Sequence, residues 1–154
     1  MIASLPFVLL LWQTSPAPQT PPKPPVAAPA PVQGPYEFAT DLGAFVVVVK
    51  SDKAASFDAA MTRLKQVFLT TNDKDRKAQA AGWRVLKSSE EATDGAITYI
   101  WLIDPVAKAA SYDPIAILKQ ISPADVQPIY DQLQASIVSI TRVGLKELLK
   151  MGGS

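Results

Sequence analysis

The side chains that most often carry out chemistry in proteins are unevenly represented in this sequence. The chain contains no histidine and no cysteine. This composition excludes a serine–histidine triad, imidazole and thiolate metal sites, and thiol-based redox chemistry. Carboxylates, lysine, tyrosine, serine and threonine remain for acid–base or nucleophilic work. We therefore expect a non-catalytic protein rather than an enzyme, and we expect no cofactor and no metal.

Two acidic clusters contain the residue types of known sites but lack their spacing. Asn72, Asp73 and Asp75 are typical of a calcium loop. An EF-hand requires glycine at the sixth position of the loop and glutamate at the twelfth, and a loop that starts at Asn72 or at Asp73 has neither. Glu90 and Glu91 are neighbours on an extended segment, so their side chains point apart and cannot form the facing pair of a glycosidase. The sequence also contains no phosphate-binding or nucleophile-elbow motif.

Three large aromatic residues are the remaining candidates for a site. Trp83, Tyr99 and Trp101 fall on two neighbouring expected strands and have the bulk to line a pocket or to cover a partner. Aromatic residues on a central strand more often belong to the core, and this alternative stays open. In a dimer built by packing two sheets together, the same residues would be buried between subunits.

The first part of the chain has the composition of a leader and a spacer. Residues 2–12 are almost wholly apolar, and a helix of this length would rise only about 17 Å against a hydrocarbon core of about 30 Å. We interpret residues 1–15 as a secretory signal peptide, although no basic residue precedes the run, with a buried helix or an uncleaved anchor as alternatives. The prediction places the protein in the periplasm or outside the cell.

Residues 16–35 form a proline-rich linker, and residues 36–154 form a single domain. Nine of the 14 prolines in the chain lie in the linker, which favours an extended, solvated spacer. The chain carries 15 Lys and Arg against 14 Asp and Glu, and Lys23 of the linker accounts for the difference. The domain is thus formally neutral, which disfavours nucleic-acid binding.

The patterns within the domain predict alternating strands and helices. A β-branched run at 45–49 predicts a core strand, and 36–40 a short edge strand before it. Periodic apolar residues predict a helix over 53–69, and a capping aspartate with a closing glycine predicts another over 74–81. Strands are expected at 83–87 and 96–104, joined through the turn signal Asp94-Gly95. The second of these strands is apolar on both faces, which is typical of a central strand.

The end of the chain is expected to be helical. Asp113 and Pro114 begin a helix that runs to about 121. A longer helix starts after Asp125, with Pro128 in its first turn, and extends to about 140, and 145–151 is expected to form a last helix. The whole order predicts an α+β domain with a small, mainly antiparallel sheet packed against helices, a ferredoxin-like βαββα arrangement without a clear fourth main strand.

Several of these segments carry a resemblance to known proteins. The stretches VVVVK at 46–50, AAGW at 80–83 and YIWLIDP at 99–105 resemble a group of uncharacterised exported bacterial proteins. Residues 45–104 are remotely similar to the dimeric α/β-barrel superfamily, whose small sheets often pack face to face in pairs. The haem-handling members of that superfamily use a histidine that this chain lacks.

These observations lead to one expected function and two alternatives. The expected function is that of an exported, non-catalytic domain that acts by protein association or homodimerisation. The first alternative is a binding protein for a small apolar ligand held between the sheet and the helix at 125–140. The second is a cofactor-free enzyme that uses Tyr99 or a buried carboxylate.

Overall fold

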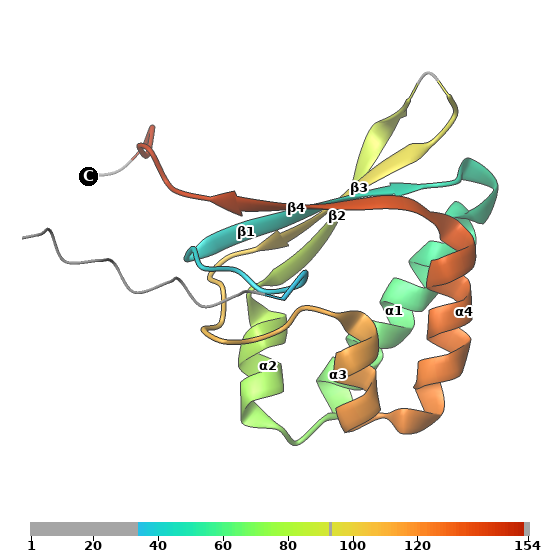
Figure 1. Ribbon diagram of the computed structural model, residues 1–154, viewed down its shortest axis with the longest axis horizontal. Coiled ribbons are helices and arrows are strands. Elements are labelled where there is room, and N and C mark those ends of the chain that lie inside the picture. The colour runs from blue at the N-terminus through green and yellow to red at the C-terminus, as the bar shows by residue number, and fades with distance from the viewer. Residues whose placement is uncertain (1–33, 93, 153–154) are drawn as a thin grey trace, which may run out of the picture. The chain divides into compact units, whose positions relative to one another are not determined.

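The computed structural model describes residues 34–92 and 94–152, which belong to one compact unit. The expected signal peptide and most of the expected linker lie outside the described residues. The helices and strands are β1 (Leu42–Val49), α1 (Ala54–Thr70), α2 (Lys74–Ala81), β2 (Trp83–Glu91), β3 (Ile97–Ile103), α3 (Pro114–Ile121), α4 (Val126–Ser136) and β4 (Ile137–Leu145) (Figure 1). Short 3-10 turns at Ser51–Lys53 and Pro123–Asp125 precede α1 and α4.

The four strands form one sheet in the order β2-β3-β1-β4, and every neighbouring pair is antiparallel. All four helices lie on the same side of this sheet (Figure 1). The predicted α+β class with a small antiparallel sheet is therefore confirmed. The expectation that the strand at 96–104 is central is also confirmed, because β3 lies between β2 and β1.

The predicted helix starts and the predicted hairpin turn form through the expected side chains. The Asp73 carboxylate accepts hydrogen bonds from the first-turn amides of α2, and the Asp113 carboxylate accepts one from the Ile115 amide at the start of α3. Asp73 is thus a helix cap. In the β2–β3 turn, Gly95 has a φ of 76°, a left-handed conformation that glycine adopts without strain.

The end of the chain differs from the prediction. The helix expected to reach residue 140 ends at Ser136, and Ile137–Leu145 form the strand β4 instead. No helix follows, because residues 146–150 have no regular secondary structure. The apolar residues at 137 and 140 suit a helical stripe, but this segment is rich in β-branched residues, which favour a strand. Its pairing with the free edge of β1, which aligns Val47 with Ile140, decides the outcome.

The expected edge strand at 36–40 is also wrong. This segment begins in a turn and ends in bends, and it is held by contacts with β4 and with the core. The Arg142 guanidinium on β4 donates hydrogen bonds to the carbonyl oxygens of Gly34 and Glu37, each at 2.7 Å. The Phe38 ring packs against Phe45 with ring centroids 4.9 Å apart. The segment therefore covers one end of the core as a pinned loop.

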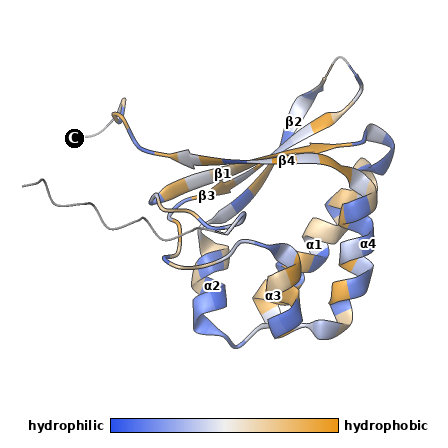
Figure 2. Ribbon diagram, in the orientation of Figure 1, coloured by the Kyte–Doolittle hydropathy of each residue, from blue (hydrophilic) through white to orange (hydrophobic). Residues whose placement is uncertain are grey.

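The core lies between the sheet and the helices. Phe45, Val47 and Val49 of β1 are buried and face α1. Aromatic rings continue this layer: the Phe57 centroid lies 4.5 Å from that of Tyr99 and 6.4 Å from that of Trp101. β1 and β3 are largely hydrophobic, whereas α2 is largely hydrophilic (Figure 2). The only buried residue of α2 is polar, Gln79.

Candidate functional site

One face of the sheet is not covered by helices. The residues of β1 that alternate with Phe45, Val47 and Val49 point to the side away from the helices, as the pleat of a strand requires. Register pairing adds the facing residues of the other strands: Ile100 lies opposite Val46, and both are only partly exposed. We call this surface the open face. It comprises Leu42, Val46, Val48, Arg84, Leu86, Thr98, Ile100, Leu102, Ser139, Thr141, Val143 and Leu145, with Ala44 buried beneath its neighbours.

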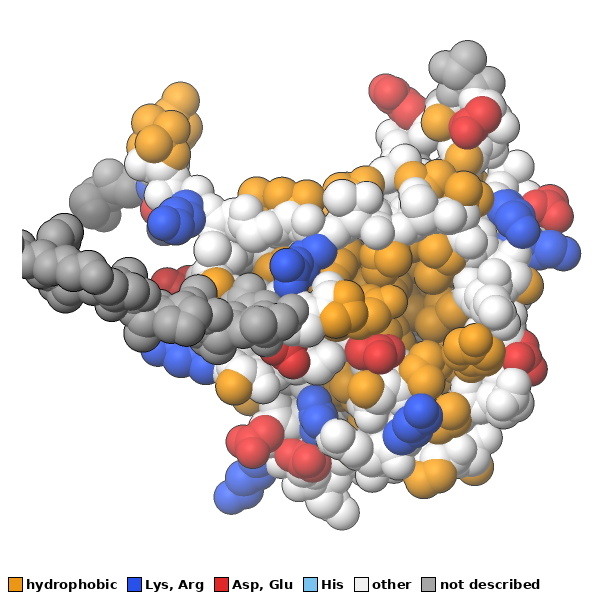
Figure 3. Space-filling model, viewed as in Figure 1, with side chains coloured by type: hydrophobic (Ala, Val, Ile, Leu, Met, Phe, Trp, Pro, Cys, Tyr) orange, Lys and Arg blue, Asp and Glu red, His pale blue; other side chains and the backbone are white. Residues whose placement is uncertain are grey.

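The open face is apolar at its centre and carries little charge. Val46 and Val48 pair with Ile100 and Thr98, and Leu86 continues the apolar row across β2 with 48% of its surface exposed. Arg84 is the one charged residue among the open-face positions. In Figure 3, apolar side chains form a band along the upper edge of the molecule, where the sheet turns away from the helices. Such a patch is typical of an interaction surface.

The three aromatic candidates lie on the opposite side of the sheet. Tyr99 and Trp101 are only 2% and 1% exposed and belong to the core. Trp83 is partly exposed, and its ring lies 5.4 Å from that of Trp101 and 6.0 Å from that of Phe68. The structure thus brings the three rings together in one layer under the helices. A partner on the open face would contact none of them.

Tyr99 takes part in a polar cluster that could have acid–base character. Its hydroxyl donates a hydrogen bond of 2.6 Å to one oxygen of Asp58 on α1, and the Lys87 ammonium donates one of 2.9 Å to the other oxygen. The same ammonium lies 5.4 Å from the centroid of the Tyr99 ring. The cluster joins α1 to both strands of the hairpin.

The pKa values of this cluster shift away from neutrality. Burial raises the pKa of Tyr99, and the hydrogen bond to Asp58 raises it further. Burial favours a higher pKa for Asp58, but the hydrogen bonds from Lys87 and Tyr99 outweigh it and lower the pKa. The hydrogen bond to Asp58 raises the pKa of Lys87. A general acid or base works best with a pKa near the working pH, and these shifts move the three pKa values away from it. They favour a structural role for the cluster, in which it holds α1 against the β2–β3 hairpin.

A groove of about 850 Å³ lies where α1 and α2 meet the edge strand β2. Met61, Leu64 and Phe68 of α1 form one side, and Trp83 and Val85 of β2 form the other. We call it the β2 groove. It does not lie between the sheet and α4, where the sequence interpretation placed a ligand. The groove is assembled from three elements and leaves no signal in any one of them, whereas the open face could be recognised from β3, which is apolar on both of its faces.

The rim of the β2 groove is basic. Lys65 on α1, Lys77 on α2 and Arg84 on β2 line it, and no aspartate or glutamate does. Arg84 has an acidic neighbour outside the groove, with its guanidinium 3.9 Å from the Asp104 carboxylate and both side chains more than half exposed, a distance at which an exposed pair contributes little. The groove thus combines an apolar interior with a positive margin.

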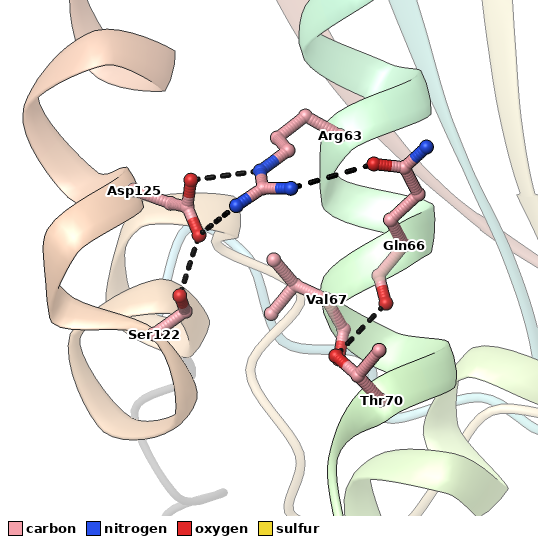
Figure 4. A network of polar contacts seen from close by, with 6 residues as sticks. All are labelled: Arg63, Gln66, Val67, Thr70, Ser122 and Asp125. Carbon is pink, nitrogen blue, oxygen red and sulfur yellow. Dashed lines mark hydrogen bonds and ion pairs between the residues drawn. The ribbon is translucent and has the colours of Figure 1, made fainter.

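A polar network fixes α1 relative to α4 (Figure 4). The Arg63 guanidinium donates two hydrogen bonds to the Asp125 carboxylate, at 2.8 and 3.1 Å, and the Ser122 hydroxyl donates one of 2.5 Å. Asp125 occupies the N-cap position of α4, as the sequence predicts, but its side chain makes no capping bond. Hydrogen bonding to Arg63, and then to Ser122, lowers the pKa of Asp125.

Neither a metal cluster nor a membrane-spanning helix occurs in the described part of the chain. Residues 34–92 and 94–152 hold no group of three or more acidic side chains that could bind a metal ion. None of the helices in these ranges is long and apolar enough to cross a membrane. Comparisons with protein-family models, with curated proteins and with solved structures gave no significant match.

Proposed function

We propose that this domain acts by association, and that its open face packs against the same face of a second copy. The observation that supports the proposal is an apolar sheet face left without a helical layer. A sheet in a small domain normally buries its apolar face against another layer, and the helices here cover only one side. A second sheet would supply the missing layer.

A second copy suits this surface better than a charged partner does. A two-fold interface brings the same patch of both subunits together, so like charges near its centre would repel each other. The centre of the open face holds Val46 and Ile100, and Arg84 lies on the edge strand β2. In a dimer, the Arg84 side chains of the two copies would therefore lie at the margins of the interface, where water and salt screen their charges.

The size of the open face predicts a reversible dimer. Strands about 4.8 Å apart and residues about 3.3 Å apart give roughly 450 Å² of flat area for paired stretches of eight residues in β1 and β4, seven in β3 and five in β2. Two copies would bury roughly twice this area, which is near the lower limit of about 1,000 Å² for specific interfaces. We therefore expect the fraction of dimer to rise with protein concentration over a range that can be measured in solution.

The ferredoxin-like arrangement is part of this proposal. β1 and β2 are each antiparallel to β3 and are thus parallel to one another, as a crossover connection requires. β4 supplies the fourth strand on the free edge of β1, and each crossover contains two helices. The remote similarity of residues 45–104 to dimeric α/β-barrel proteins agrees with face-to-face pairing.

The proposal describes a non-catalytic, exported protein. A catalytic role finds no support in a chain without histidine and cysteine, or in a Tyr99 cluster whose pKa values move away from neutrality. Export is supported by the apolar run at 2–12 and the proline-rich stretch at 16–35. Cell fractionation with sequencing of the mature N-terminus tests the export.

Light scattering after size exclusion, over a range of protein concentrations, tests the association. The wild-type protein is expected to change from monomer to dimer as its concentration rises, and Val46→Lys is expected to remain monomeric. Tyr130→Lys is the matched control, because Tyr130 is an exposed apolar residue on α4, on the helical side. A wild-type protein that stays monomeric at high micromolar concentration would contradict the proposal.

A further inference from the structure

We propose that the β2 groove is a binding site for a free amphipathic anion with an elongated apolar body and a single carboxylate head, such as a medium- or long-chain fatty acid. The site shares only Arg84 and Leu86 with the open face, because the rest of its lining comes from α1, α2 and the helix-facing side of β2. Its volume of about 850 Å³ is within the range of small-molecule sites.

The interior of the groove suits an acyl chain. Phe68 and Trp83 both line it and pack edge to face against each other, with ring centroids 6.0 Å apart, so they form a continuous aromatic surface. Met61 contributes an unbranched, adaptable side chain that tolerates ligands of varied shape. Leu69 and Val85 expose 69% and 41% of their surfaces at the groove, and an apolar ligand would remove this area from water.

The charge of the margin determines the head group. Lys65, Lys77 and Arg84 come from three different elements, no acidic residue lines the groove, and the acidic group paired with one of them, Asp104 beside Arg84, is an exposed neighbour at 3.9 Å. A carboxylate at the mouth would interact with these cations while its chain lies on the apolar interior. A neutral apolar molecule would gain only the contact between its chain and the apolar interior.

An added peptide strand is a poorer match for the same groove. β2 is an edge strand, and a peptide could in principle pair with its free backbone groups. However, the regular pairing of β2 with β3 covers only Trp83 to Lys87 before the register shifts. The lining residues of β2 end at Leu86. So short a segment offers few backbone groups to a peptide, whereas a compact ligand needs none.

Isothermal titration calorimetry with laurate, below its micelle-forming concentration, tests the site. Laurate is expected to bind saturably, and dodecanol, which has the same chain without the charge, is expected to bind several-fold more weakly. Lys65→Gln combined with Lys77→Gln is expected to weaken laurate binding about tenfold, because each exposed cation contributes roughly two- to fivefold. The same pair of changes should leave dodecanol binding unchanged. Added salt should weaken only laurate.

Two further variants separate the groove from the rest of the surface. Lys119→Gln removes an exposed lysine of α3 that does not line the groove, and it is expected to bind laurate as the wild type does. Ala81→Trp places a large side chain at the exposed margin of the groove and is expected to abolish binding. Circular dichroism checks that each variant is folded.

Several outcomes would overturn the inference. They are the absence of laurate binding to the folded protein, equal affinities for laurate and dodecanol, and unchanged laurate affinity in the double lysine variant. Binding of an acidic apolar peptide without laurate binding would assign the groove to a protein partner. Attachment to anionic phospholipid vesicles without binding of free laurate would assign it to a lipid surface. The oligomeric state is measured separately, so neither result depends on the proposed dimer.

Discussion

The backbone of Gly82 lies directly against Pro105. A Cβ atom at position 82 would be 2.5 Å from the Pro105 carbonyl oxygen, closer than a Cβ atom approaches a non-bonded atom. The Asp104 amide also donates a hydrogen bond of 2.7 Å to the Gly82 carbonyl oxygen. The junction between α2 and β2 thus touches the chain that leaves β3, and this contact helps to fix the hairpin beside α2.

Gly82→Ala is expected to lower the free energy of unfolding by about 1–3 kcal/mol, because the new methyl group must displace backbone rather than a flexible side chain. Gly152→Ala is the matched control, since a Cβ at that position meets nothing within 4 Å. Urea denaturation of both variants measures the difference. Equal free energies of unfolding for the two variants would show that the backbone at Pro105 can shift to accept the methyl group at little cost.

Gln79→Ala is expected to destabilise the protein by about 1–3 kcal/mol. The Gln79 side chain is 2% exposed, donates a hydrogen bond of 2.8 Å to the Ser111 carbonyl oxygen and accepts one of 2.6 Å from Arg76. Truncation leaves the Ser111 carbonyl oxygen without this donor and leaves a cavity. Gln134→Ala, at an exposed position of α4, should change the urea midpoint little. A stable Gln79→Ala would mean that water replaces the amide.

The parts of the fold that local signals encode could be predicted from the sequence. The bounds of α2 and α3 follow from caps that act within a few residues, such as Asp73 and Asp113. The hairpin follows from Asp94-Gly95, and the central position of β3 from its two apolar faces. The caps and the turn act between residues close together along the chain, and the central position of β3 is indicated by the apolar residues of that strand alone.

The parts that depend on distant contacts could not be predicted. Ile137 and Ile140 fit a helical stripe and a strand equally well, and only the free edge of β1, about ninety positions earlier, selects the strand. The 36–40 segment is held as a loop by Arg142 from the far end of the domain. The sequence indicates Trp83, Tyr99 and Trp101 as candidates for a site but does not show which face of the sheet the helices cover. That choice depends on tertiary packing, and it makes Tyr99 and Trp101 core residues.

The ion pair between Arg63 and Asp125 should make stability depend on pH in the acid range. Hydrogen bonding to Arg63 lowers the pKa of Asp125 in the folded protein, so the folded state binds the proton more weakly than the unfolded state does. The stabilising contribution is complete above the unfolded-state pKa of about 4 and is lost as the pH falls through the lower folded-state value.

Asp125→Asn is therefore expected to be less stable than the wild type at neutral pH, and the difference should shrink below about pH 4. Urea denaturation at a series of pH values gives the two stability curves. Asp52→Asn, which alters a carboxylate 70% exposed on the surface, serves as the control and should follow the wild type. A stability difference that stays constant down to strongly acid pH would show that the geometry of Asp125, rather than its charge, is what matters.

A single engineered cysteine can locate the proposed dimer interface, because the native chain contains none. Val46 lies near the middle of the open face, in register with Ile100 on one side and Thr141 on the other. If two open faces pack about a two-fold axis, residues near the centre face their own copies. Val46→Cys is thus expected to form a covalent dimer on mild oxidation or with a short bifunctional thiol reagent. Tyr130→Cys, on the helical side, should remain monomeric on denaturing gels, and equal cross-linking of the two variants would point to random collision rather than to an interface at the sheet.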